Sequence, residues 1–229
     1  MISPLLANVY LHYVLDLWVN QWRKRYADGA ILIVRYADDF VMGFQYQHDA
    51  DRVLQNLRER MNRFGLALHP TKTRLIEFGR YARERRAKRG DSKPQTFDFL
   101  GFTHYCGMKL KDKGFILKRK TTAKRLRDKL QEVKGIVMRR RHEPVGVVGS
   151  WLRTVVQGYF NYHAIPGNMA ALQTFRREVS RCWLHSLRRR SQRHRMNWER
   201  FRKLEARWIP KLRILHPYPS ERFYARNPR

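Results

Sequence analysis

The chain contains very little cysteine. Of its 229 residues only Cys106 and Cys182 are cysteines, and they are far apart, with no Cys-x-x-Cys pair and no histidine at a zinc-ligand spacing. A disulfide framework needs paired cysteines, and a structural zinc site needs closely spaced Cys and His ligands. Neither can therefore be the basis of this fold, and we expect two reduced thiols.

The chain also lacks a long uninterrupted apolar run. Its most apolar segment lies at the N-terminus, where Asn8, His12 and Asp16 interrupt it and no basic leader precedes it. Signal peptides and membrane helices need longer or differently flanked apolar segments. We therefore expect a cytoplasmic protein that has no membrane partner.

Acidic residues are scarce as well. Against 49 Lys and Arg there are 19 Asp and Glu, which gives a formal net charge of +30. The excess is uneven, because residues 1–118 carry +9 and residues 119–229 carry +21. With 43% hydrophobic residues the chain can still bury a core. The charge favours a polyanionic partner, and nucleic acid is the expected one.

Two adjacent aspartates stand between two apolar runs. Tyr36-Ala37-Asp38-Asp39 separates Ile31–Val34 from Phe40–Met42. Successive strand residues face opposite sides of a sheet, so both carboxylates can serve one site only if the backbone turns beside them. The pattern predicts a β-hairpin with its turn at Asp38-Asp39, and carboxylates held together in this way suit Mg²⁺. The alternative is that aspartate is simply a good turn former.

Hydrophobic periodicity predicts helices, strands and one loop along the rest of the chain. The first helix has an apolar face that includes Leu6, Val9, Tyr10, Val14 and Leu17. Expected helices cover residues 4–26, a segment between Gly43 and Gly65, and 122–141, 146–163, 168–191 and 197–208. Expected strands cover residues 66–68, 73–78, 97–105 and 114–117, and residues 80–94 read as a polar loop.

Four segments of the first half resemble successive sequence blocks of the reverse transcriptase palm. They are Ile2–His12, Tyr36–Asp39, Gly65–Thr73 and Phe97–Phe102, and they are most similar to bacterial group II intron reverse transcriptase/maturases. Further along, Trp151–His163 resembles the maturase-specific thumb region of that family. The resemblance implies an α+β fold, with part of a right-hand polymerase palm over residues 1–118 and an all-α thumb and maturase region over residues 119–229.

The same resemblance implies roles for individual residues. Asp38 and Asp39 would hold Mg²⁺, with two ions in the complete active site, and would serve nucleotidyl transfer to a DNA 3′ end. Lys72 would lie beside the phosphates of the incoming dNTP, although a solvated strand-end lysine is the alternative. Gly101 would belong to a primer grip under the template-primer, although a glycine of an ordinary core strand is the alternative.

A basic cluster follows in the second half, interleaved with Trp183 and Trp198. It resembles a helix that grips RNA phosphates, although a run of charge is often only a solvated face. Its members are Arg188, Arg189, Arg190, Arg193 and Arg195.

The implied function is that of an RNA-directed DNA polymerase of a group II intron, which binds intron RNA and assists splicing. Family members carry fingers and a further metal-binding aspartate ahead of the block that begins at Ile2. We therefore expect a truncated or split enzyme that lacks processive synthesis by itself. No His-Asn-His endonuclease module is recognisable. An RNA-binding maturase remnant without polymerase activity is the alternative, and a non-functional relic is a third possibility.

Overall fold

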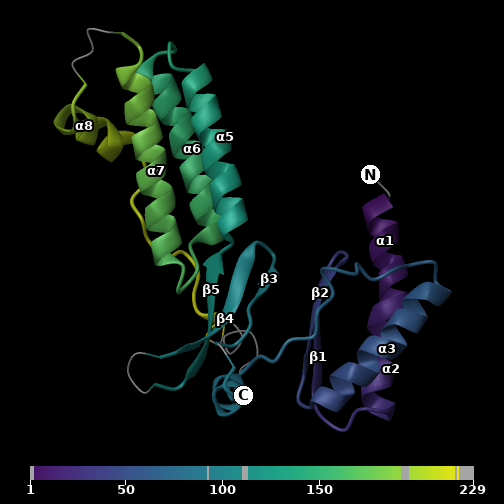
Figure 1. Ribbon diagram of the computed structural model, residues 1–229. Coiled ribbons are helices and arrows are strands. Elements are labelled where there is room, and N and C mark those ends of the chain that lie inside the picture. Colours follow the sequence, from purple (N-terminus) through teal and green to yellow (C-terminus); the bar gives the residue numbers. More distant parts are fainter. Residues whose placement is uncertain (1–2, 92, 110–112, 192–195, 220, 222–229) are drawn as a thin grey trace. The chain divides into compact units, whose positions relative to one another are not determined.

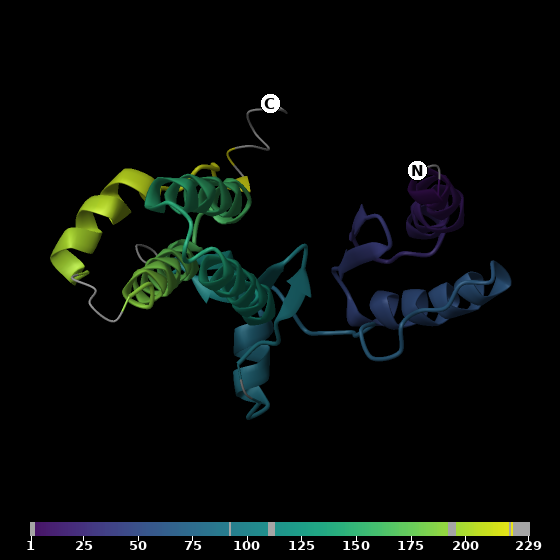
Figure 2. The same cartoon turned by 90° about the horizontal axis from the view of Figure 1, so that it is seen from above.

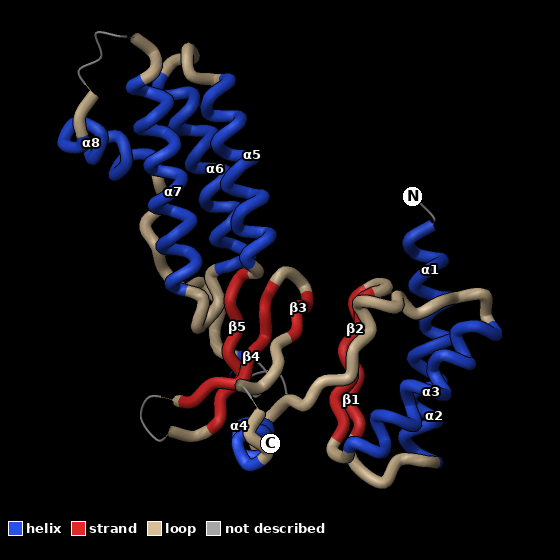
Figure 3. The backbone as a smooth tube through the Cα atoms, viewed as in Figure 1, coloured by secondary structure: helices blue, strands red, loops and turns tan. Residues whose placement is uncertain are grey.

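The computed structural model describes residues 3–91, 93–109, 113–191, 196–219 and 221 (Figure 1). The chain divides into two compact units, Met1–Gln95 and Thr96–Arg229. Each unit has its own buried apolar cluster. Each combines helices with one small antiparallel sheet (Figure 3), so the mixed helix and sheet content agrees with the predicted α+β class.

The first unit begins with a long helical segment and continues with a hairpin and two further helices. The helical segment runs without a break through α1, the π-helical η1 and α2, as predicted for residues 4–26. The elements are α1 (Ser3–Leu11), η1 (His12–Asp16), α2 (Leu17–Arg25), β1 (Ile31–Tyr36), β2 (Asp39–Phe44), α3 (Gln47–Arg63) and α4 (Ala82–Lys88).

The buried face of the first helix is shorter than predicted. No residue of α1 is buried, and Leu6, Val9 and Tyr10 are exposed. Burial begins only at Val14 and Leu15, which pack with residues of α3 such as Leu57. The periodic apolar pattern predicted the helix correctly, but in its first half Tyr10 contacts Phe64 while remaining exposed, and only the second half is buried.

The helix α3 ends as its sequence predicts. Gly65 has a φ of 66°, which glycine adopts without strain. Its amide donates to Asn62 O (3.1 Å) while the amide of Leu66 donates to Met61 O (2.9 Å), the bond pattern of a Schellman cap.

Two predicted strands and one predicted loop are wrong. Residues 66–69 and 73–78 have no strand pairing, although Leu66 and Leu68 pack against the core. A β-strand exists only where a neighbour takes up its backbone hydrogen bonds, and in the described part of this unit β1 and β2 pair only with each other. Residues 82–88, predicted as loop, form α4, which agrees with the high helix propensity of their Ala, Arg, Glu and Lys side chains.

The second unit is a three-stranded meander followed by four helices, which match the predicted helices closely. Its elements are β3 (Phe97–Phe99), β4 (Phe102–Met108), β5 (Phe115–Thr121), α5 (Ala123–Arg139), α6 (Val145–His163), α7 (Met169–Arg188) and α8 (Trp198–Trp208). The sheet order is β3-β4-β5, all antiparallel. The single strand predicted over residues 97–105 is therefore two strands joined by a tight turn.

Helices α5, α6 and α7 lie side by side, and α8 crosses against them (Figures 1 and 2). The centre of this unit holds large side chains with no exposed surface, among them Leu152, Phe175, Trp183 and Phe201. Tyr159 stacks on Phe175 with ring centroids 3.7 Å apart, so it packs between α6 and α7.

The division between the compact units lies at 95/96, whereas the predicted domain boundary at 118/119 falls inside β5. A buried polar contact explains why the meander groups with the helices. The Asn168 side chain accepts from the Thr121 amide (2.8 Å) and donates to the Thr121 hydroxyl (2.8 Å), which ties the end of β5 to the start of α7. The functional assignment of palm and thumb stays a prediction.

Candidate active site

The two aspartates lie at the tip of the β1–β2 hairpin. Tyr36 pairs with Asp39, so the two-residue turn consists of Ala37 and Asp38, one position earlier than predicted. Ala37 adopts a φ of 55°, in the left-handed region that tight hairpin turns require. Asp39 can therefore join the ladder as the first residue of β2. The hairpin was predicted correctly, and the position of its turn was not.

Both carboxylates are accessible. Asp38 and Asp39 are exposed, and neither side chain bonds to another described residue. Their oxygens keep their lone pairs available for a cation, and carboxylate oxygens are the donors that hard divalent cations take. In the described part of the chain no third His, Cys, Asp or Glu lies close enough to complete a ligand group with them.

An arginine next to these aspartates holds the turn to the helix behind it. Arg35 on β1 donates to both carboxylate oxygens of Asp16, at 2.9 Å from Nε and 2.7 Å from Nη2. Its Nη1 donates to Asn8 Oδ1 (2.9 Å) and to the carbonyl oxygen of Ala37 (2.8 Å). The contact therefore spans α1, η1 and the turn itself.

This arginine was missed at the sequence level. A signal was present, because Asn8, His12 and Asp16 interrupt an apolar helix at intervals of four residues and so share one face. A charged residue inside the apolar run before Asp38 was the second signal. Only the fold brings Arg35 and that polar stripe together.

The Arg35–Asp16 pair is charged on both sides. The hydrogen bonds from Arg35 hold the pKa of Asp16 below its ordinary value of 3.8, and His12 acts in the same direction. The same bonds raise the pKa of Arg35. The guanidinium is thereby neutralised locally, so it adds little repulsion to a cation at the neighbouring turn.

Lys72 lies elsewhere on the first unit. It is exposed in a turn at residues 70–72 that is closed by a bond from Thr73 N to His69 O (3.0 Å). Neither a hydrogen bond nor an ion pair joins its ammonium to Asp38 or to Asp39. Its role at the dNTP phosphates stays a prediction.

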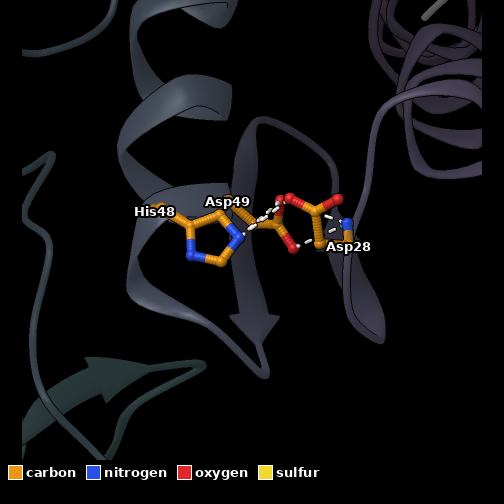
Figure 4. A group of neighbouring side chains, drawn as sticks. All are labelled: Asp28, His48 and Asp49. Carbon is orange, nitrogen blue, oxygen red and sulfur yellow. Dashed lines mark hydrogen bonds and ion pairs between the residues drawn. The ribbon is translucent and has the colours of Figure 1, made fainter.

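A second group of potential ligands, not foreseen from the sequence, lies at the far end of the hairpin. Atoms of Asp28, His48 and Asp49 lie within 4.8 Å of one another (Figure 4). The Asp49 carboxylate has no exposed surface and accepts from the amides of Asp28 (3.2 Å) and Gly29 (3.0 Å). Arg52 donates to Asp28 Oδ2 (3.2 Å) and to Tyr26 O (2.8 Å).

The contacts of this second group are already satisfied within the protein and stabilise its local structure. Both oxygens of Asp49 face backbone donors, and the Arg52 guanidinium already supplies the positive charge that a metal ion would bring. The contacts fix the loop between α2 and β1 against the start of α3, and so they hold the base of the hairpin that carries Asp38.

Gly101 lies in a turn rather than inside a strand. Leu100 and Gly101 have φ values of 48° and 79° and link the paired residues Phe99 and Phe102. The Tyr162 hydroxyl donates to Leu100 O (2.7 Å), and a Cβ at Gly101 would lie 2.9 Å from Nη1 of Arg125. The strand-glycine interpretation is corrected to a turn glycine, and its contact with a primer stays a prediction.

One comparison with known proteins found a match that includes the hairpin site. Residues 1–104 match the family model described as reverse transcriptase (RNA-dependent DNA polymerase). Over this region the chain is similar to a reverse transcriptase domain. The region contains Asp38, Asp39, Lys72 and Gly101. No curated protein matches the chain.

The matching family has general requirements. Enzymes of this class bind a nucleic-acid template and dNTP substrates and depend on metal ions. Among the described residues, none of the helices is both long and apolar enough to cross a membrane.

Outside the matched region, the predicted basic cluster is only partly described. Arg193 and Arg195 lie outside the described residues. Arg188 donates to Met196 O (3.1 Å), and Arg190 donates to the carbonyl oxygens of Glu143 (2.8 Å) and His142 (3.2 Å). Both side chains are half-buried, whereas Arg189 is exposed. Two of the three described arginines therefore fasten chain segments together, which the sequence did not reveal.

Proposed function

We propose that this chain carries part of an RNA-directed DNA polymerase of a group II intron, with Asp38 and Asp39 as ligands of Mg²⁺. The observation that carries the proposal is the placement of two exposed, unpartnered carboxylates at a hairpin tip inside the matched region. The sequence blocks shared with group II intron reverse transcriptase/maturases support the finer assignment.

The residues at the tip fit a hard divalent cation. Asp38 offers a carboxylate from the turn, and Asp39 offers one from the first position of β2. Bound Mg²⁺ would lower the pKa of the primer 3′-hydroxyl and neutralise charge on the dNTP phosphates. The chain itself contributes the fixed turn, the ligand oxygens and, from Lys72, a candidate cation for the leaving pyrophosphate.

For the second unit we propose binding of intron RNA and of the RNA/DNA template-primer. Residues 119–229 carry +21 on a helical scaffold. Phosphates bind such surfaces without regard to base sequence. The Leu100-Gly101 turn, held by Tyr162, would support the primer.

Primer extension on poly(rA)/oligo(dT) with Mg²⁺ tests the polymerase proposal. Because the chain alone is expected to lack processive synthesis, the 229-residue chain and its Asp38→Asn variant are compared under the same conditions, each mixed with a complementing fragment that carries the fingers and upstream palm of such an enzyme. Extension that the variant loses by at least about 100-fold would support a role in holding the metal. Extension that survives the substitution would remove Asp38 from the site. Circular dichroism of the variant checks that it is folded.

A second function has its own supporting observation. The carboxylates at the tip have no third acidic or histidine ligand nearby in the described part of the chain, which favours a maturase that binds RNA without polymerising. In that case the wild-type chain would bind intron RNA in a filter assay but would give no Asp38-dependent extension. The two assays together therefore separate the two functions.

A further inference from the structure

We propose that Arg35 is a positioning residue of the hairpin site: it fixes the Ala37–Asp38 turn by holding the carbonyl of Ala37 against Asp16 and Asn8. The proposal concerns the geometry of the turn, and its effect on cation binding rests on the function proposed for Asp38 and Asp39. Three independent features of the structure support it.

The first feature is the set of hydrogen bonds that the Arg35 guanidinium donates. Its Nε and Nη2 edge meets Asp16 in a two-bond fork, and its Nη1 bridges Asn8 and the Ala37 carbonyl. The side chain is only 14% exposed. A planar group with donors in fixed directions transmits the position of one partner to the others, which the flexible point charge of a lysine does not do.

The partner side chains are themselves held in place. Asn8 Nδ2 donates to Pro4 O (3.0 Å), so its oxygen is turned toward Arg35. Asp16 also lies 3.3 Å from His12 Nδ1. Arg35 therefore fixes the position of the turn relative to the helical segment that carries Asn8 and Asp16, and not only relative to the opposite strand.

The second feature is strain at the turn. Ala37 is one of only three described non-glycine residues with a positive φ, and this conformation is unfavourable for a residue with a Cβ. A two-stranded hairpin is too weak by itself to maintain such a turn. Because no hydrogen bond or ion pair to another described residue holds the Asp38 side chain, its position depends on what holds the backbone at Ala37.

The third feature is the π-helical segment that ends at Asp16. The amide of Leu17 donates to His12 O, a bond across five residues. Such segments are rare, and many occur at functional sites. Arg60 of α3 donates to the carbonyl oxygen of Val14 (2.6 Å), and among the described residues it has no hydrogen bond to Arg35 or to the turn.

The test uses terbium(III) as the probe, because this ion takes carboxylate oxygens and emits when a nearby tyrosine is excited. Tyr36 is 66% exposed and adjoins the turn, so it serves as the antenna. Titrations compare the full chain with Arg35→Ala, Arg35→Lys and Asp38→Asn. Arg60→Ala is the matched control, since it also removes a half-buried arginine that binds a backbone carbonyl of η1.

Arg35→Ala should weaken terbium binding about 10-fold or more, the range found when a residue that orients a metal ligand is removed. Arg60→Ala should leave the affinity within about twofold of wild type. Arg35→Lys should recover part of the thermal stability but little of the affinity, because lysine cannot form the fork and the carbonyl bond together. Equal losses in the Arg35 and Arg60 variants would overturn the proposal.

Hydrogen exchange separates this proposal from the proposed function. If Asp38→Asn leaves the terbium signal unchanged, the metal role of Asp38 fails. Arg35→Ala should even then accelerate amide exchange across residues 36–41, while Arg60→Ala should not. Unchanged exchange at these amides in the Arg35 variant would show that the turn does not depend on Arg35.

Discussion

His163 shows how a single buried residue can make the stability of a whole unit depend on pH. Its ring lies 7% exposed among Phe102, Tyr159 and Thr121, with Nδ1 at 3.4 Å from the Thr121 hydroxyl. Burial lowers its pKa from 6.5 to about 4, and the nearby Arg125 acts in the same direction. The folded protein therefore keeps this imidazole neutral.

We expect the stability of the second unit to fall as the pH is lowered from 6.5 toward 4. The unfolded chain takes up the proton near pH 6.5, whereas the folded chain does so only near pH 4, so protonation favours the unfolded state in this window. The loss is at most about 3 kcal/mol and does not grow further below the lower value.

Urea unfolding at pH values on both sides of this window measures the effect. His163→Gln removes the titrating group, so the variant should lose less stability between neutral pH and pH 4 than the wild type does. Wild-type and variant curves that run parallel across the window would mean that His163 is protonated in the folded state as readily as in the unfolded chain.

Individual residues were predictable where their role is local. Asp38 and Asp39 could be selected from the sequence because they are adjacent and stand between two apolar runs. Arg35 does not, because its partners lie 19 and 27 positions away in the sequence and only the fold brings them together. For Arg188 and Arg190 the RNA contacts suggested by charge stay a prediction, and the structure adds that both guanidinium groups bind backbone carbonyls.

At the scale of elements, two glycines inside helices have opposite roles. Gly149 on α6 lies against α8, and a Cβ there would come within 2.6 Å of Cγ of Trp208. Gly135 on α5 has nothing within 4 Å of the corresponding position. The missing side chain is thus required for helix packing at Gly149 and serves no packing purpose at Gly135.

The two alanine substitutions should therefore change stability in opposite directions. Gly135→Ala should stabilise the protein by about 1 kcal/mol, because alanine is the better helix former. Gly149→Ala should destabilise it by roughly 1–3 kcal/mol, because Trp208 must move and α8 must shift with it.

Chemical denaturation of the two variants and of wild type provides the comparison. The Gly149 variant should also change the tryptophan fluorescence of the folded state, which the Gly135 variant should leave alone. Stabilisation by both substitutions would mean that α8 adapts to the added methyl group at no cost.

Elements were predictable where one sequence segment contains all the information that specifies them. The helices from α5 to α8 satisfy this condition, since their apolar faces repeat at helical spacing and glycine or proline separates most of them. The segments at 66–68 and 73–78 do not, because a strand depends on a neighbour that its own sequence cannot specify. The split of residues 97–105 at Leu100-Gly101 likewise depends on two positive φ values.

At the scale of the whole molecule, the charge of +30 is the dominant property. Residues 119–229 carry +21 of it, in part on exposed side chains such as Lys124, Arg127, Lys134 and Arg189. Like charges at this density repel one another and have to be offset by the apolar core beneath them. A polyanion bound to this surface would remove that repulsion, so RNA should stabilise the fold as well as bind to it.

The full chain should bind structured RNA with an affinity that falls steeply with salt, because each neutralised phosphate releases condensed counterions. With about 6–10 phosphate contacts, the loss between roughly 50 and 200 mM salt is about 10³–10⁵-fold. Arg189→Ala should reduce the slope of the salt dependence by up to about one contact on many RNA sequences alike, since phosphate contacts carry no base information.

Arg188→Ala is the matched control: it removes the same charge together with the bond to Met196 O, and should lower thermal stability as well. Filter binding with both variants gives the slopes, and an unchanged slope for Arg189→Ala would assign that side chain to the solvated face and move the search for the RNA surface to Lys124, Arg127 and Lys134.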